Sequence, residues 1–291
     1  MPILTVNHKT VYRYARPVQF GEHRLMFRPR DSHDLRLLDT ALLIQPTASV
    51  RWLFDVFGNS IAIASFTQPA AELVFESTFR AEQFLAVEPA LALEPYAQRY
   101  PFRYSADEIP DLGRTIERGY ADPGRKIDTW ARWFIEGGRS LDTMDILIAM
   151  TRSIQVQFGY ARREEVGTQD PIQTLETRTG SCRDFALFMM EAARSLGFAA
   201  RFVSGYLYDE KLINAGSGLI GGGATHAWVQ IYLPGAGWVE FDPTNGQVGG
   251  RNLIRVAVAR DPSQAIPLTG TFNGSPSDVL GMSVAVHVTA E

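Results

Sequence analysis

The sequence contains one cysteine, Cys182, and no long apolar segment. A lone cysteine excludes a disulfide within the chain, and no stretch approaches the length that a membrane-spanning helix requires. The first twenty residues alternate in polarity and lack both the apolar stretch and the small-residue cleavage site of a secretory signal. These absences predict a soluble, cytoplasmic protein that does not associate with a membrane.

An excess of positive charge is also missing. The 28 lysines and arginines are outnumbered by 32 aspartates and glutamates, which gives a formal net charge of -4. Proteins that bind nucleic acid through its phosphates have a basic patch or stripe instead. The five histidines are too scattered to suggest a metal cluster. The composition therefore argues against a nucleic-acid partner, and we expect no cofactor.

The chain has enough apolar residues for a large core. It has 291 residues, 45% of them hydrophobic, which suits one large domain or two ordinary ones, and we favour two. Residues 3 to about 85 alternate with period two between turn signals, which is typical of antiparallel strands. The candidate strands are 6–14, 23–29, 35–46, 50–57, 60–66 and 72–84. We therefore predict a β-sandwich domain over residues 1–100.

From about residue 106 to residue 197, apolar residues recur at helical spacing instead. Asp122 and Asp170, each followed by proline, look like N-caps with a proline in the first turn. The expected helices are one that follows Asp122 and ends at Gly137 and Gly138, one at 141–156, one from Asp170 to near Gly180, and one at 182–196. Helices dominate this region.

Beyond residue 197 the strand pattern returns. The expected strands are 200–208, 225–233, 237–241, 253–259 and 279–288. Helices followed by strands predict an α+β domain over residues 101–291, and the last strand either belongs to it or returns to the sandwich. A glycine-rich segment, 212–223, is either a substrate gate or an ordinary flexible connection.

The setting of Cys182 suggests a reactive thiol. It follows Gly180 and Ser181 and begins an apolar helix with the sequence FALFMMEAARSL. Unpaired amides and the positive end of the helix dipole would then surround the sulfur and favour the thiolate. The backbone amide of Cys182 can also stabilise the oxyanion that forms when sulfur attacks a carbonyl.

His226 and Asp242 are the candidate partners of this thiol. His226 begins one predicted strand, Asp242 ends the next, and the tight turn PGAG joins the two strands. Antiparallel pairing would place the two side chains close together, where a carboxylate can hold one imidazole nitrogen and leave the other facing sulfur. Asp242 also lies in DPTNG, which looks like a turn, and both roles are compatible.

These segments together resemble a known family. The chain is similar to the bacterial transglutaminase-like superfamily, related to papain-type cysteine peptidases, in the segments GSCRDFA, RFVSGYL, HAW, YLPGAGWVEFDPTNG and LIRVAVARD. The segments HKTVYRYARPVQFGEHRLMFRPRD and DVFGNSIAIASF resemble the β-sandwich domain that precedes the catalytic core in bacterial members. The resemblance implies that Cys182 is the nucleophile, His226 the general base and acid, and Asp242 the orienting carboxylate. It also implies a core in which the cysteine helix packs on an antiparallel sheet.

Five neighbouring residues are weaker candidates. Gln157 and Tyr160 are the two side chains upstream of the cysteine that can supply a second oxyanion donor, and the spacing does not choose between them. Arg183 and Asp184 would occupy the first turn of the helix, either supporting the site or lying on a solvated face. Trp228 shares a strand face with His226 and would either wall the cleft or belong to the core.

The expected chemistry is acyl transfer through a thioester on the cysteine. Hydrolysis by water would make the protein a cysteine peptidase or amidase acting on a protein or peptide substrate, and this is the outcome we favour. Attack by an amine acceptor would make it a transglutaminase, and a non-catalytic binding or scaffold protein on a degenerate core is the alternative of another class. Animal transglutaminases use calcium, but no acidic segment here has calcium-ligand spacing, so we expect no metal.

Overall fold

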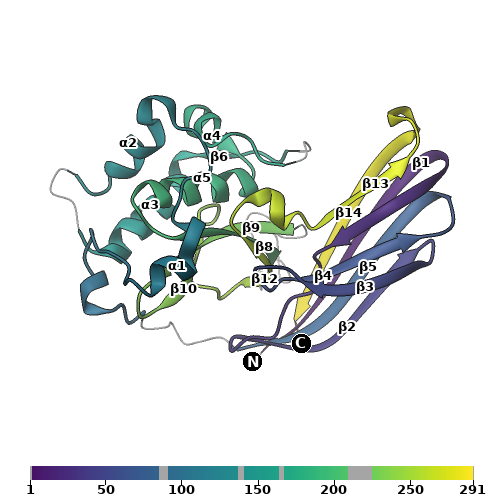
Figure 1. Ribbon diagram of the computed structural model, residues 1–291, viewed down its shortest axis with the longest axis horizontal. Coiled ribbons are helices and arrows are strands. Elements are labelled where there is room, and N and C mark those ends of the chain that lie inside the picture. Colours follow the sequence, from purple (N-terminus) through teal and green to yellow (C-terminus); the bar gives the residue numbers. More distant parts are fainter. Residues whose placement is uncertain (1, 85–90, 137–140, 164–166, 209–224, 291) are drawn as a thin grey trace.

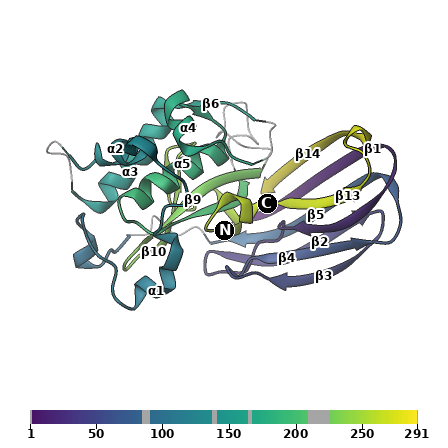
Figure 2. The same cartoon turned by 45° about the horizontal axis from the view of Figure 1, so that its top comes forward.

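The computed structural model describes residues 2–84, 91–136, 141–163, 167–208 and 225–290. The helices gather at one end of the molecule and the N-terminal strands at the other, with the second sheet between them (Figure 1). The 45° turn of Figure 2 keeps the helical end and the N-terminal strands apart in the same way. The predicted α+β fold class, with mostly antiparallel strands before a core of helices and a second sheet, is confirmed.

The N-terminal part is a curled antiparallel sheet of seven strands. Its strands are β1 (Ile3–Leu25), β2 (Leu35–Gln45), β3 (Ala48–Phe54), β4 (Ser60–Phe66), β5 (Ala70–Gln83), β13 (Leu268–Asn273) and β14 (Val279–Ala290). The order is β2-β5-β1-β4-β3, and β13 and β14 both pair with β1. The first half of β1 pairs with β5 and β14, and its end pairs with β4 and β13. Strand β1 is therefore shared by both layers of the curled sheet.

The length of β1 differs from the sequence expectation. The predicted strands 6–14 and 23–29 are parts of one strand, which ends at Leu25. Pro17 lies between these two predicted strands, and it falls inside β1 where the register with β5 shifts between Arg13 and Val18. A proline, which lacks an amide donor, is tolerated in a sheet at such an irregularity. The C-terminal strands β13 and β14 pair with β1, while the boundary near residue 100 stays a prediction.

The second part contains the helices and a five-stranded antiparallel sheet. The helices are α1 (Glu108–Leu112), α2 (Lys126–Arg132), α3 (Thr143–Gln157), α4 (Pro171–Thr177) and α5 (Cys182–Ser195). The sheet has the order β11 (Gln247–Val248), β10 (Gly237–Asp242), β9 (Thr225–Leu233), β8 (Ala200–Leu207) and β12 (Leu253–Ala259). The short strands β6 (Gly159–Tyr160) and β7 (Thr179–Gly180) pair in parallel. Five single 3₁₀ turns complete the described elements: η1 (Pro95–Ala97), η2 (Gly113–Thr115), η3 (Pro123–Arg125), η4 (Pro262–Ala265) and η5 (Pro276–Asp278).

Helix α5 is the centre of this core. Its residues Phe185, Leu187 and Phe188 are at most 1% exposed, and they pack among α2, α3, α4 and the sheet strands β8 and β9. The helix is thus surrounded on nearly every side, and its buried charged residues Asp184, Glu191 and Arg194 have hydrogen-bond partners. Because a fully buried side chain of this size contributes about 1.5–3 kcal/mol, the packing fixes the helix and the cysteine at its start.

The two parts of the molecule share an apolar interface. Leu4, Val6 and Phe79 of the N-terminal sheet form one buried cluster with Tyr206 and Ile254 of the second sheet. Strands β8 and β12 therefore face the N-terminal sheet, while β8 and β9 also pack against α5. The second sheet is a layer between the helices and the N-terminal strands.

The start of α2 also differs from expectation. Asp122 caps a 3₁₀ turn, and α2 begins only after Arg125, which has a left-handed backbone. The Asp122 carboxylate nevertheless accepts hydrogen bonds from the amides of Ile127 and Asp128, so it satisfies the first turn of α2 from one turn away. The expected helix end at Gly137 and Gly138 lies outside the described residues, as does the glycine-rich segment 212–223. Within the described ranges, no helix has the length and apolar character needed to cross a membrane.

Candidate active site

Cys182 is the first residue of α5, and a carboxylate fixes the turn that precedes it. Asp184 Oδ2 accepts hydrogen bonds from the backbone amide and the hydroxyl of Ser181, both at 2.8 Å. A Cβ on Gly180 would lie 2.9 Å from the Asp184 Cβ, so the chain needs glycine there to pass this close. The thiol of Cys182 is mostly buried, with 7% of the residue exposed.

Asp184 also binds residues from outside the helix, in the chain segment between β6 and α4. Its Oδ1 accepts hydrogen bonds from the Arg163 guanidinium and from the Gln169 amide, each at 2.8 Å. Because Asp184 is fully buried, the solvated face considered for it is excluded. Arg183, which directly precedes Asp184 in α5, is half-buried. The carboxylate holds the cysteine turn in one place relative to the residues that precede α4.

The second half of the site is a histidine–carboxylate pair on the sheet. Phe241 pairs with Val229 across β10 and β9, so His226 lies a diagonal step from Asp242. His226 Nε2 and Asp242 Oδ2 are 2.8 Å apart, and both residues are at most 1% exposed. The alternation of side chains along β9 and β10, and the tight turn that joins the two strands, bring these side chains together.

Asp242 also organises the turn in which it lies. Its oxygens accept hydrogen bonds from the Thr244 amide at 2.9 Å and from the Asn245 side chain at 2.8 Å. Burial would raise the pKa of this carboxyl, but His226 and the two turn donors together hold it below its usual range. Asp242 is therefore an ionised orienting group and a turn residue at once.

The imidazole of His226 is arranged to hold a proton. Burial alone would lower its pKa, but Asp242 and Cys182 raise the pKa of His226 to about 10. The contribution of Cys182 identifies the thiol as a neighbour of the ring. Among the described residues, no hydrogen-bond partner satisfies the buried Nδ1 atom. Since Nε2 is held by Asp242, Nδ1 is the ring atom available to exchange a proton with sulfur.

Trp228 belongs to the core behind the imidazole. It is fully buried, and its ring stacks on that of His226 with centroids 5.9 Å apart and an interplanar angle of 25°. Its indole N–H donates to Glu240 Oε2 at 2.5 Å. Of the two roles considered for Trp228, the structure favours core packing.

Tyr160 lies beside the cysteine. Tyr160 pairs with Gly180 in the β6–β7 ladder, two residues before Cys182. Burial and the nearby Cys182 raise the pKa of Tyr160, while Arg183 opposes that rise. Gln157 is the last residue of α3 and its side chain is exposed. Of the two candidates that spacing could not separate, Tyr160 is the one that these contacts place near the thiol.

Sequence analysis missed several residues of this site. Arg163 and Gln169, which bind Asp184, are 21 and 15 residues away from it in the chain, and no local pattern marks them. Asn245 could have been found, since it follows Asp242 within the turn sequence DPTNG. A carboxylate in such a turn commonly bonds to residues two or three positions further on.

Comparisons with known proteins agree with the fold. Residues 4–82 match the model of the bacterial transglutaminase-like N-terminal region, and residues 138–243 match that of the transglutaminase-like superfamily. A crystal structure described as "a Putative Cysteine Protease" from Cytophaga hutchinsonii superimposes with a TM-score of 0.71 and 19% identity, covering 100% of this chain and 90% of that one. The chain is therefore similar to the transglutaminase-like superfamily over residues 138–243 and to the N-terminal region of its bacterial members over residues 4–82, which confirms the resemblance found in the sequence.

Two relatives are similar to this chain in sequence, one over nearly its whole length and one over a short segment. An uncharacterized protein of Mycobacterium tuberculosis is 27% identical over 303 residues, covering 97% of this chain and 91% of the relative. A protein-glutamine gamma-glutamyltransferase of Pseudomonas aeruginosa is 36% identical over 69 residues, covering 24% of this chain and 10% of the relative. The first similarity extends over both parts of the molecule, and the second is confined to a short segment.

Proposed function

We propose that this protein is a thiol-dependent enzyme that cleaves amide or peptide bonds through a thioester on Cys182, with a protein or peptide as substrate. One observation supports this above all. A buried His226–Asp242 pair, 2.8 Å apart, leaves the Nδ1 atom of the imidazole without a described partner, beside the only cysteine of the chain. Similarity to the transglutaminase-like superfamily supports thiol chemistry at the level of the family.

The first half of the proposed reaction forms the thioester. The Cys182 thiolate attacks the carbonyl carbon, and the electron pair of the C=O bond moves onto oxygen. When the tetrahedral intermediate collapses, the C–N bond breaks and the His226 imidazolium gives its proton to the departing nitrogen. The raised pKa of His226 keeps that proton available at neutral pH, and Asp242 stabilises the charged ring.

The oxyanion needs donors beside the sulfur. The first four amides of a helix have no partner within it, and the Cys182 amide is the first of α5. The Tyr160 hydroxyl is the second donor that we propose, because Tyr160 lies beside the thiol. Two donors aimed at developing charge are what acyl transfer requires.

In the second half, neutral His226 accepts a proton from water as the water oxygen attacks the thioester carbonyl. The C–S bond then breaks, which releases the carboxylic acid and restores the thiolate–imidazolium pair. An amine can replace water, and the product is then a new amide. The short segment shared with the Pseudomonas aeruginosa gamma-glutamyltransferase keeps transamidation as a second candidate. We favour hydrolysis because it needs no dedicated amine pocket.

A mass-spectrometric trapping experiment tests the proposal. The purified protein is exposed to peptide pools with and without putrescine, and intact mass and peptide mapping follow. We expect an acyl adduct on Cys182 that disappears with release of free acid, and none in Cys182→Ala. Incorporation of putrescine without acid release would favour transamidation instead. No adduct under any condition, with Cys182 as slow as free cysteine toward iodoacetamide, would support the binding or scaffold alternative.

A further inference from the structure

A cavity that Cys182 does not line lies between the N-terminal sheet and the outer side of the second sheet. Its volume is about 240 Å³. The N-terminal part contributes the segments 30–32 and 57–59, and the second sheet contributes residues of β8 and β12. Arginines line it from both sides: Arg30, Arg201 and Arg255. Neither cysteine nor histidine is among its lining residues.

Arg30 is held in position at this cavity. Its guanidinium lies over the Phe54 ring, 5.3 Å from the centroid. A Cβ on Gly58 would come within 2.2 Å of Arg30 Nη1, so the backbone of the β3–β4 turn also passes directly against the charged group. Gly58 has a φ of +74°, which suits glycine. Arg30 thus contacts a ring and a glycine turn, but its side chain is exposed and no described residue forms an ion pair with it.

Arg201 is a half-buried cation that forms no ion pair with any described residue. Its Nε donates to the Gln230 side chain at 2.6 Å, and its guanidinium stacks on Trp238 at 4.0 Å from the ring centroid. The two terminal nitrogens make no hydrogen bond with any described residue. Burial lowers the pKa of Arg201 to about 10 in spite of the charge on Glu240. A charge that is partly removed from water costs free energy unless an anion compensates it.

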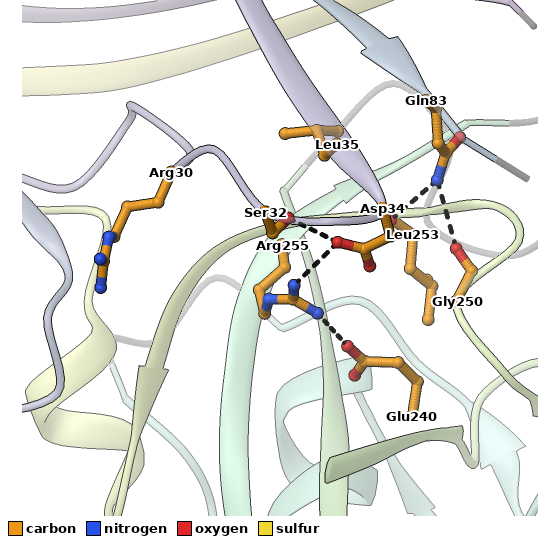
Figure 3. Close-up of a pocket in the computed structure, with 9 residues that line it drawn as sticks. All are labelled: Arg30, Ser32, Asp34, Leu35, Gln83, Glu240, Gly250, Leu253 and Arg255. Atoms are coloured by element: carbon orange, nitrogen blue, oxygen red, sulfur yellow. Dashed lines mark hydrogen bonds and ion pairs between the residues drawn. The ribbon is translucent and has the colours of Figure 1, made fainter. Parts of the chain in front are cut away.

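The acidic groups nearby are already engaged. Figure 3 shows Arg255 between two carboxylates, Asp34 and Glu240. Arg255 donates to Glu240 Oε1 at 2.7 Å and to Asp34 Oδ1 at 3.3 Å. The remaining acid at the cavity is Asp31, which is exposed. Positive charge on Arg30 and Arg201 is therefore left uncompensated at the cavity wall.

We propose that this cavity binds a small anion with two or more negative charges, of the carboxylate or phosphate class, between Arg30 and Arg201. Guanidinium groups bind both kinds of oxyanion through paired N–H donors. The cavity is smaller than the roughly 300–1,000 Å³ that drug-sized ligands occupy, which suits a compact anion. Phe57, Val256 and Val258 are the apolar residues of the lining, and they would limit the access of water to the ion. The bound anion would join the two parts of the molecule, since its ligands come from both.

Isothermal titration with citrate and with inorganic phosphate, at fixed ionic strength and near neutral pH, tests this proposal. We expect saturable binding of one anion per chain. Arg30→Gln and Arg201→Gln should each weaken binding about tenfold, the loss of one charge-assisted pair. Arg103→Gln, which alters an exposed arginine outside the cavity, is the matched control and should bind as the wild type does. Tighter binding of citrate identifies carboxylate ligands, and tighter binding of phosphate identifies phosphorylated ones.

Two results would overturn the proposal: no saturable binding of either probe to the wild type, or unchanged affinity in both Arg30→Gln and Arg201→Gln. Arg201 is packed on Trp238, so circular dichroism must show that Arg201→Gln folds; Arg30 is exposed, and its variant keeps the test decisive if Arg201→Gln does not. Cys182→Ala should retain full affinity, which separates this site from the proposed thiol chemistry.

Discussion

At the scale of single residues, each group of the site has a different task in the proposed reaction. In the proposed reaction the His226 imidazolium supplies the proton, and Asp242 keeps the ring charged and oriented. Stabilisation of the oxyanion is a separate task, and a side chain that lies beside sulfur can perform it. Tyr160 lies beside Cys182, and we propose it for this task rather than the exposed Gln157.

Tyr160→Phe should therefore slow acylation of Cys182 by a small activated ester such as p-nitrophenyl acetate. The loss of one oxyanion donor typically lowers the rate about 100-fold or more, with little change in KM. Gln157→Ala is the matched control and should react at the wild-type rate. The opposite pattern, a slow Gln157→Ala and an unaffected Tyr160→Phe, would assign the donor to Gln157 instead. Pre-steady-state release of nitrophenol measures both variants.

At the scale of elements, the start of α5 depends on a buried carboxylate. Asp184 binds Ser181 in the turn before the helix and Arg163 from outside it. Asp184→Asn removes the charge that compensates Arg163 while keeping the shape of the side chain. Breaking a buried pair in this way costs about 3–5 kcal/mol of unfolding free energy.

Urea denaturation measures that cost, and the alkylation rate of Cys182 should fall in the same variant because the turn loosens. Asp111→Asn changes an exposed aspartate of α1 and serves as the control. A variant as stable as the wild type would show that Asp184 does not fix the start of the helix.

Strands β1 and β8 are joined by a buried histidine. His8 Nδ1 lies 2.8 Å from the Tyr206 hydroxyl, and burial lowers the pKa of His8 from 6.5 to about 4. The unfolded chain therefore binds the proton more readily between pH 6.5 and about 4, and stability is lost as the pH falls through this range. The full contribution is about 3 kcal/mol, present above pH 6.5 and gone below pH 4.

Urea denaturation between pH 7 and pH 4 checks this dependence. His8→Gln, which cannot titrate, should show a shallower loss of stability on acidification than the wild type. His287→Gln, an exposed histidine of β14, should leave the dependence unchanged. An equally steep loss in His8→Gln would assign the acid sensitivity to other groups.

The three candidate catalytic residues were easier to predict from the sequence than the residues that hold them in place, and the reason is physical. Cys182, His226 and Asp242 are set by local patterns: a glycine before an apolar helix, and two alternating strands around a tight turn. The partners of Asp184 and the pairing of Tyr160 with Gly180 depend on contacts between distant segments, which no period in the sequence records. The assignment of these residues to catalysis stays a prediction.

The same difference holds for the elements of the fold. Elements set by local sequence patterns were predicted, and those set by pairing between distant segments were not. Strands and helices with strong periodicity were anticipated within a few residues, as with α5 and β9. The union of two predicted strands in β1 was not anticipated, because Pro17 ends a strand by local preference and is tolerated here by a shift in register. Strand β13 was missed, since its pattern is short and its pairing with β1 links segments about 250 positions apart.

At the scale of the whole molecule, hydrogen bonds as well as apolar packing join the two parts. The Asn59 side chain donates to the Val258 carbonyl at 2.7 Å and accepts from the Val258 amide at 2.9 Å. Asn59 is 3% exposed, so water cannot easily replace these bonds. The turn between β3 and β4 thus pairs with β12 through a single side chain.

Asn59→Ala should lower the free energy of unfolding by about 2–4 kcal/mol, because two buried backbone groups lose their partner. Asn273→Ala, at an exposed position of β13, is the control and should have little effect. Chemical denaturation gives the values, and limited proteolysis should cut Asn59→Ala faster near the junction. Equal stability of the two variants would mean that apolar packing alone holds the parts together.

The central claim is that Cys182, His226 and Asp242 form one nucleophilic site, and alkylation of the only cysteine tests it most directly. The rate constant for iodoacetamide is measured by intact mass from pH 5 to pH 9 in the wild type and in His226→Gln. We predict that the wild type reacts faster than free cysteine at pH 6, and that His226→Gln reacts about tenfold or more slowly than the wild type at that pH. The contrary result is a wild-type rate no greater than that of free cysteine, with no change in His226→Gln.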